Sequence, residues 1–255
     1  MRQAVRVSTS STSATERAGE RGGPNDVTLF GHWICPYSVR VSFALAQREI
    51  AHDLVDVPPT AARPKGFVVP EEFVAHSPKG EIPLVRIGTE YRADSLPILE
   101  WLEDSRSASP LLPGDAVGRA RVLERATWID REVFPPMIGV YYGTRTDAIE
   151  RSSAALTAAL GRMGQWLHDG SWLAGSGPTL AEAVVVPVYA RLEGLAALGF
   201  TGHLDHRVAD HLERCRDLSG GSAVWWTATQ TDEFVHRFER YRAIVAGSTS
   251  DQPDE

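Results

Sequence analysis

The chain has few cysteines, few lysines and no long apolar run. Its 255 residues include two cysteines, Cys35 and Cys215, too few for a disulfide framework, so we expect a reduced, cytoplasmic protein. No apolar stretch approaches the roughly 18 residues that cross a bilayer, so we expect no membrane partner. Lys65 and Lys79 are the only lysines, and the formal charge of -7 argues against nucleic acid as a partner.

The two ends of the chain are polar. Residues 1–24 are rich in Ser, Thr, Arg and Gly, with almost no large apolar side chains, a composition typical of a disordered tail. They lack the apolar segment of a secretion signal. Because Glu16 is the first acidic residue, an organelle transit peptide stays an alternative. Residues 247–255 are predicted to form a second polar tail.

Between the tails, the sequence predicts two domains of different class. Residues 25–106 alternate short β-rich runs with helical segments, which indicates a small α/β domain. Residues 107–118 contain Ser, Pro and Gly and are predicted to be a linker. Residues 119–246 show helical periodicity, which predicts an all-helical domain. The expected strands are Val27–Phe30, Asp53–Val57, Leu84–Ile87 and Glu90–Arg92, and the expected helices are Pro36–Gln47, Leu96–Asp104, Arg119–Phe134, Ala148–His168, Leu180–Leu198, Asp205–Asp217 and Ser222–Tyr241.

Cys35 stands where an apolar strand turns into a helix. Pro36 follows it directly, and proline is favoured at the first position of a helix. Cys35 is therefore expected at or next to the N-cap, where unpaired backbone N–H groups and the helix dipole favour thiolate over thiol. The sequence predicts a nucleophilic cysteine, and the alternative is a buried structural cysteine.

The residues around Cys35 limit its chemistry. Ser38 stands where a two-cysteine redox motif has its second thiol. Any disulfide chemistry at Cys35 must therefore use a thiol from solution. His32 is a candidate proton carrier, and the alternative is a histidine bonded to the backbone. Cys215 lies in a polar helical stretch with no turn to present it, and we expect it to be structural.

Two further motifs indicate a small peptide ligand. Ile82 and Pro83 lie between a turn and a strand, a position suited to a cis peptide bond that leaves the backbone of Ile82 free to pair with an extended peptide. Asp94 can pair with an ammonium group, and Ser95 opens a helix whose N-terminus can hold a carboxylate. A carboxylate and an amine on one carbon, followed by a cysteine, describe γ-glutamyl-cysteinyl-glycine, which is glutathione.

The helical domain carries a folding signal and no metal signal. Thr179 and Glu182 precede an apolar run and fit a capping box, in which each side chain bonds the backbone N–H of the other. The histidines, including His203, His206 and His211, have no spacing typical of metal ligands, so we expect no metal.

In this order the motifs resemble those of the cytosolic glutathione S-transferases, over about residues 27–244. The Cys-Pro-Tyr-Ser form at Cys35 is similar to that of the omega class and of related bacterial cysteine-type enzymes. The resemblance implies a thioredoxin-like α/β N-terminal domain and an all-α C-terminal domain that binds the second substrate. It also implies glutathione as co-substrate and a homodimer. The capping box matches the family's, which usually has Asp at the position of Glu182.

The resemblance also implies roles for individual residues. Cys35 is expected to face the glutathione sulfur. Ile82 and Pro83 are expected to anchor the cysteinyl backbone of glutathione. The glutathione-binding residues are expected to be Tyr37, Ile82, Pro83, Asp94 and Ser95, of which Asp94 and Ser95 hold the γ-glutamyl end.

The second-substrate pocket is expected beyond a break in the first long helix of the C-terminal domain. Pro135 and Pro136 must break or kink that helix, and an aromatic, partly apolar run follows. The alternative for this run is ordinary core packing. The candidate pocket residues are Trp33, Met137, Tyr141 and Tyr142, with Trp128, Trp225 and Trp226 as further alternatives.

The leading hypothesis is thiol transfer on a disulfide or other small-molecule substrate. Cys35 takes the glutathionyl group from a mixed disulfide or adduct, and a second glutathione regenerates it. One alternative is conjugation, dehalogenation, ether cleavage or isomerisation of a small electrophile in a catabolic or biosynthetic pathway. Another is a non-catalytic binding protein. Residues 67–70 lack the lysine that omega-type enzymes often place near the glycyl end, so a different small thiol is a further alternative.

Overall fold

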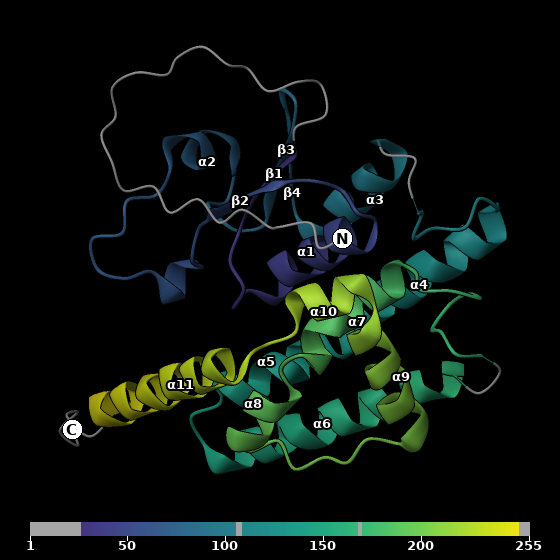
Figure 1. Cartoon of the computed structure of the whole chain (residues 1–255). Coiled ribbons are helices and arrows are strands. Elements are labelled where there is room, and N and C mark those ends of the chain that lie inside the picture. The colour runs from purple at the N-terminus through teal and green to yellow at the C-terminus, as the bar shows by residue number, and fades with distance from the viewer. Residues whose placement is uncertain (1–26, 106–108, 168–169, 250–255) are drawn as a thin grey trace. The chain divides into compact units, whose positions relative to one another are not determined.

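The structure, a computed structural model, describes residues 27–105, 109–167 and 170–249. It divides the chain into two compact units, Met1–Pro110 and Leu111–Glu255 (Figure 1). The predicted tail at residues 1–24 lies outside the described residues. Part of the second predicted tail is helical, because the last helix continues to Thr249. The glutathione-site candidates belong to the first unit, and the pocket candidates Met137, Tyr141 and Tyr142 belong to the second.

The first unit is built on a four-stranded sheet in the order β2-β1-β3-β4. Strand β1 (Val27–Gly31) pairs in parallel with β2 (Asp53–Asp56) and antiparallel with β3 (Leu84–Ile87), which pairs antiparallel with β4 (Glu90–Ala93). The parallel pair requires a crossover, which α1 (Pro36–Gln47) supplies. All four strands match their predicted ranges to within one residue.

Helices cover both faces of this sheet (Figure 1). Because side chains alternate along a strand, Leu29 packs with Ile98 under α1 and α3, while Phe30 packs with Phe73 of α2 on the other face. The prediction of a thioredoxin-like α/β domain is therefore confirmed. Helix α2 was not predicted from the sequence. The remaining helices of this unit are the 3-10 turn Thr60–Ala62, α2 (Glu71–His76) and α3 (Ser95–Ser105).

The second unit is all-helical over the residues that the structure describes, as predicted. Helix α7 is buried along its whole length and packs against α4 and α9. The helices are α4 (Ala116–Glu132), α5 (Phe134–Tyr142), α6 (Thr146–Gly164), the 3-10 turn Gln165–Leu167, α7 (Leu180–Tyr189), α8 (Leu192–Ala197), α9 (His206–Asp217), α10 (Ser219–Val224) and α11 (Ala228–Thr249).

Two predicted long helices are each divided in two. The predicted helix 180–198 is interrupted near Arg191, whose fully buried guanidinium donates to the carbonyl of Pro187 at 2.6 Å. The predicted helix 222–241 contains the end of α10, an interruption at residues 225–227, and the first part of α11. The expected break before Pro135 is confirmed, since both prolines lie in the first turn of α5, where a missing N–H costs nothing.

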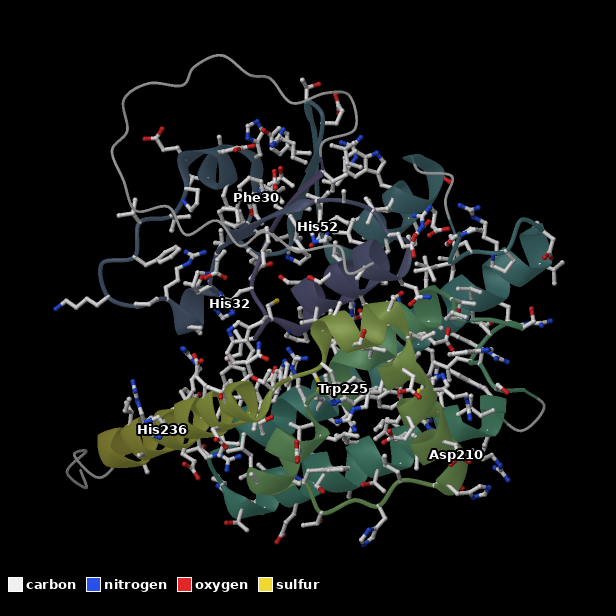
Figure 2. The ribbon with its side chains drawn as sticks, in the orientation of Figure 1. Phe30, His32, His52, Asp210, Trp225 and His236 are labelled. Atoms are coloured by element: carbon white, nitrogen blue, oxygen red, sulfur yellow. The ribbon has the colours of Figure 1, made fainter. Side chains whose placement is uncertain are left out.

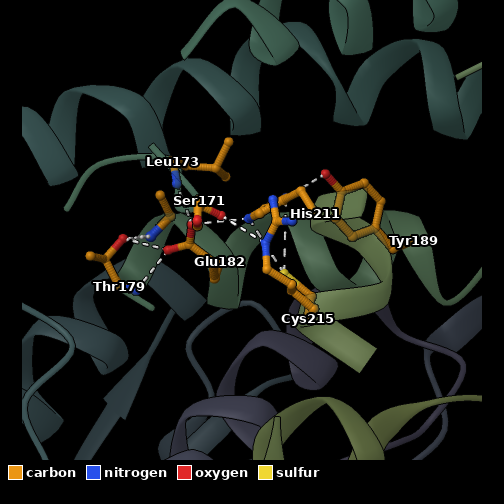
Figure 3. Close-up of polar contacts among 9 residues, drawn as sticks. Ser171, Leu173, Thr179, Glu182, Tyr189, His211 and Cys215 are labelled. Atoms are coloured by element: carbon orange, nitrogen blue, oxygen red, sulfur yellow. Dashed lines mark hydrogen bonds and ion pairs between the residues drawn. The ribbon is translucent and has the colours of Figure 1, made fainter. Parts of the chain in front are cut away.

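The capping box of α7 is confirmed and is larger than predicted (Figure 3). Glu182 Oε2 accepts from the backbone N–H and the hydroxyl of Thr179, both at 2.7 Å. Its Oε1 accepts from Leu173 N–H at 2.6 Å and lies 3.2 Å from Nε2 of His211. The Nδ1 atom of His211 lies 2.9 Å from the hydroxyl of Tyr189. One buried carboxylate thus joins the start of α7 to α9.

Candidate functional site

Cys35 is the N-cap of α1, as predicted, with Pro36 at the first helical turn. Its backbone is extended (φ -81°, ψ 116°), so the sulfur lies at the open end of the helix. The residue is 6% exposed, and its Sγ lies 3.8 Å from the carbonyl oxygen of Ile82. The first N–H groups of α1 and the positive end of its dipole lie at this end of the helix. The role of Cys35 as a nucleophile stays a prediction.

The turn before Cys35 is held by His32, which follows β1 (Figure 2). The Nδ1 atom of His32 accepts from Ile34 N–H at 3.1 Å, and Nε2 lies 3.9 Å from the carboxylate of Asp56. The backbone N–H of Cys35 donates to the carbonyl of His32 at 3.0 Å. Because Nδ1 is engaged with the backbone, His32 shapes the turn. Trp33 packs against its ring at 5.5 Å.

The peptide bond between Ile82 and Pro83 is cis, as predicted. Both residues are buried, directly before β3. The structure therefore brings Ile82 and Pro83 next to Cys35, although 47 positions separate Ile82 from Cys35 in the sequence. A backbone edge beside a sulfur is the arrangement expected for a cysteinyl ligand.

Asp94 connects β4 to α3, and Ser95 is the first residue of α3. Asp94 has φ +66°, a left-handed conformation that Asp tolerates better than most residues. Its carbonyl accepts from Ile98 N–H at 3.1 Å, as the first acceptor of α3. Its carboxylate lies 3.6 Å from the ammonium of Lys79. Asp94 therefore already forms an ion pair with an ammonium group of this chain, the same kind of interaction that we expect with the amine of the ligand.

Arg40, which was not predicted as a site residue, contacts Ser95. Arg40 is 1% exposed, and its Nη1 donates to Ser95 Oγ at 3.1 Å. Its guanidinium carbon lies 4.8 Å from the centre of the Tyr37 ring. A signal was present, because Arg40 stands between Val39 and Val41 on a helix with an apolar face, and arginine is almost never fully buried without a partner.

The aromatic candidates of the second unit lie in one cluster on α5 and α11. Met137 is fully buried, and Tyr141 is 5% exposed. Tyr142 is 38% exposed and meets the ring of Tyr241 edge-on at 5.4 Å. Three of the four predicted pocket residues lie in this unit, and of these only Tyr142 presents substantial surface. The ring of Tyr141 packs against that of Tyr142 at 5.0 Å. The role of these three residues in substrate binding stays a prediction.

The tryptophan alternatives have different surroundings. Trp128 lines a groove of about 430 Å³ along α4, with the guanidinium of Arg162 at 5.0 Å from its ring. Trp226 is buried against Arg191, at 4.6 Å. Trp225 is half-buried. The groove is lined by Leu123, Glu124, Thr127, Trp128, Arg131 and Glu132.

Within the described residues, no three His, Cys, Asp or Glu side chains gather as metal ligands. No helix there is both long and apolar enough to cross a membrane. Cys35 and Cys215 are both free cysteines.

Comparison with known proteins identifies what the chain resembles. Residues 34–105 match the family model for the glutathione S-transferase N-terminal domain. The maleylacetoacetate isomerase of Rhizobium meliloti is 28% identical over 179 residues, 64% of this chain and 80% of that relative. The match thus extends beyond the N-terminal domain.

Two solved structures show the same fold. Glutathione transferase Omega 3C of Trametes versicolor has a TM-score of 0.73 at 19% identity, over 88% of this chain and 94% of that one. The maleylacetoacetate isomerase of Methylobacterium extorquens AM1, with malonate and glutathione bound, has a TM-score of 0.60 at 22% identity, over 78% and 95%. At these identities the likeness shows the fold.

Proposed function

We propose that this chain, a glutathione S-transferase by its N-terminal domain and by its fold, is a glutathione-dependent enzyme that isomerises a small cis-unsaturated acid. The similarity to maleylacetoacetate isomerase over 80% of that relative's length carries this proposal. It supports the isomerisation alternative more than the thiol transfer that the Cys-Pro-Tyr-Ser motif suggested. The structural likeness to an isomerase holding glutathione and the dicarboxylate malonate supports it further.

The reaction needs a thiolate and no other reagent. The glutathione thiolate adds to one carbon of the C=C bond, and the π electrons move onto the conjugated carbonyl oxygen. The former double bond, now single, rotates. The electrons then return, the C–S bond breaks, and the trans isomer leaves with the thiol regenerated. No net oxidation or reduction occurs, so glutathione acts as a catalyst.

The residues of the N-terminal unit fit the binding of glutathione. The carboxylate of Asp94 binds the γ-glutamyl ammonium, and Ser95 binds the carboxylate on the same carbon. The backbone of Ile82 pairs with the cysteinyl unit. Cys35, 3.8 Å from Ile82 O, then lies beside the glutathione sulfur, at a helix end that stabilises negative charge.

Thiol transfer is the second candidate, because a specific observation favours it. Cys35 is the N-cap of α1, a position that suits a thiolate able to form a mixed disulfide with glutathione. In that reaction Cys35 is covalently modified in each cycle. In isomerisation, the glutathione sulfur forms the transient bond and Cys35 is not modified.

The deciding experiment follows maleylacetone, a methyl ketone with a cis C=C bond, by the coupling of its vinyl protons in NMR. The purified protein is tested with glutathione, without thiol, and with S-methylglutathione, which has no free thiol. If the protein is an isomerase, the trans form appears in the sample that contains protein and glutathione, and not in the samples without thiol or with S-methylglutathione. Equal rates with and without protein would refute the proposal.

A parallel assay with glutathione disulfide tests the second candidate. Thiol transfer predicts one glutathionyl adduct in the intact mass, lost in Cys35→Ser and retained in Cys215→Ala. Reduction of a small disulfide by glutathione would then be abolished by Cys35→Ser. An isomerase would keep measurable isomerisation in Cys35→Ser, because the nucleophile is supplied by glutathione.

We also propose a homodimer in a reducing compartment such as the cytoplasm. Membership of the glutathione S-transferases supports the dimer, and the two free cysteines fit a reducing compartment. The molar mass in solution by light scattering tests the dimer, and a monomer at micromolar concentration would refute it.

A further inference from the structure

Arg40 is a permanent positive charge in the interior of the N-terminal unit. It extends from α1, is 1% exposed, and touches two residues of the proposed glutathione site. Its Nη1 donates to Ser95 Oγ at 3.1 Å, and its guanidinium carbon lies 4.8 Å from the centre of the Tyr37 ring. Removing a guanidinium from water is costly.

The chemistry of the guanidinium and the hydroxyl determines what the Ser95 hydroxyl can do in this contact. A guanidinium has five N–H donors and no acceptor. In its bond to Arg40, the oxygen of Ser95 must therefore accept. The hydroxyl hydrogen of Ser95 cannot point toward Arg40, and it is left to donate elsewhere.

The surroundings of Ser95 decide which group best receives that hydrogen. Ser95 is the first residue of α3, an 11-residue helix, and the first N–H groups of a helix favour an anion. The guanidinium of Arg40 adds positive charge behind the hydroxyl. Donor, helix end and buried cation thus all favour a carboxylate at the same point.

We infer that Arg40 is a positioning residue that holds the Ser95 hydroxyl as a donor toward the α-carboxylate of the γ-glutamyl group. The inference rests on the proposed function, because it takes glutathione as the ligand at Ser95. Arg40 touches no ligand atom. Arg40 orients Ser95, which contacts the ligand. Its contact with Tyr37 also connects this end of the site to the first turn of α1, next to Cys35.

The experiment compares two ligands by isothermal titration calorimetry. One is glutathione. The other is 4-aminobutyryl-cysteinyl-glycine, which differs from glutathione only in lacking the α-carboxylate. The measured quantity is the ratio of the two dissociation constants, and this ratio isolates the carboxylate contact. A hydrogen bond to a charged group predicts that the wild-type protein prefers glutathione by roughly ten- to a hundredfold.

Three single variants and one double variant test the donor argument. Arg40→Gln introduces an acceptor, so the Ser95 hydroxyl can turn inward, and we expect the ratio to fall to within about threefold of one. Arg40→Lys keeps a donor-only cation, and we expect it to retain most of the preference. Ser95→Ala removes the donor, and combining it with Arg40→Gln is expected to lower the ratio no further than Ser95→Ala alone.

Arg48 supplies the matched control. It lies at the end of the same helix, is equally buried at 1%, and pairs with Glu103 of α3 at 3.1 Å. The same substitutions there are expected to lower thermal stability and leave the ligand ratio unchanged. A purely structural role for Arg40 would instead make Arg40→Gln weaken both ligands alike, with the ratio preserved, and that result would overturn the inference.

The outcomes separate this inference from the proposed function. If the wild-type protein binds neither ligand, the glutathione site fails and this inference fails with it. If the wild-type protein binds glutathione with the expected preference but Arg40→Gln keeps the ratio, only the role of Arg40 is refuted. If Arg40→Gln does not fold, loss of the preference in the folded Arg40→Lys protein refutes the donor argument, and its retention there supports it.

Discussion

The two cysteines of this chain are both buried, and they stand in opposite electrostatic surroundings. Cys35 is 6% exposed at the N-terminus of α1, with its sulfur 3.8 Å from the carbonyl oxygen of Ile82. Cys215 is 0% exposed in the last turn of α9, with its sulfur 3.5 Å from Nε2 of His211. Burial, and then the nearby carboxylate of Glu182, raise the pKa of the Cys215 thiol well above its ordinary value. Exposure alone therefore does not separate a candidate nucleophile from a structural thiol.

The surroundings of Cys215 show that residue types common in active sites can instead stabilise the fold. The imidazole of His211 lies within hydrogen-bonding distance of a cysteine, a glutamate and a tyrosine (Figure 3). The carboxylate of Glu182 also accepts from two backbone N–H groups. These bonds satisfy a carboxylate that would otherwise be costly to bury. Between α7 and α9 these residue types are buried and bonded to one another or to the backbone, so they stabilise the fold.

The largest expected effect is on stability and comes from Glu182→Ala. The substitution leaves His211 and two backbone N–H groups buried without their acceptor, so the free energy of unfolding is expected to fall by about 3–5 kcal/mol. Urea denaturation measures it. The control is Asp205→Ala, which removes the exposed N-cap of α9 and is expected to cost only about 1 kcal/mol. Equal losses in the two variants would contradict the role assigned to the buried network.

The next prediction concerns the relative reactivity of the two thiols. In the native protein iodoacetamide is expected to modify Cys35 at least about a hundredfold faster than Cys215, because reactivity requires thiolate and access. Peptide mass spectrometry after timed quenching measures both rates. In denaturant the two rates should converge. A native rate at Cys215 equal to that at Cys35 would refute the distinction drawn between them.

The third prediction is a loss of stability at alkaline pH that depends on Cys215. The raised pKa keeps its proton on the folded protein while the unfolded chain releases it. This contribution to stability is therefore fully present below the ordinary thiol pKa and is lost as the pH rises above about 8.5, by about 1 kcal/mol per pH unit. Unfolding free energy from pH 8 to 10 measures it.

Two variants identify the groups responsible. Cys215→Ala should flatten this pH dependence, whatever its effect on stability at neutral pH. Tyr189→Phe should flatten only the part near pH 10, because burial likewise raises the pKa of the Tyr189 phenol. An unchanged slope in Cys215→Ala would show that its thiol does not titrate differently in the two states.

The smallest expected effect is at the exposed ion pair of the N-terminal site. The ammonium of Lys79 lies 3.6 Å from Asp94 and would compete with the ammonium of glutathione for that carboxylate. Because exposed pairs contribute little, Lys79→Ala is expected to tighten glutathione binding by roughly two- to fivefold. Calorimetry measures it. Arg92→Ala, which removes the exposed pair with Glu90, should leave binding unchanged, and weaker binding in Lys79→Ala would contradict competition.

The features that could be predicted from the sequence depend on residues close to one another along the chain. Proline after Cys35 indicated the start of α1, and the spacing of Thr179 and Glu182 indicated the capping box. Helix α2 was missed because its six residues, Glu71–His76, are too few to show a periodicity. The division of the predicted helix 180–198 was missed because it involves the guanidinium of Arg191, whose position depends on folding.

The sequence by itself determined the two domain classes, the strands and the helix end at Cys35, because strand alternation and helix capping act over a few residues. Tertiary structure alone decided what surrounds each side chain. It brought Arg40 to Ser95 across 55 positions and His211 to Glu182 across 29. Contacts at such separations form only when helices pack, and they determine which polar groups are buried together and which are left to meet a ligand.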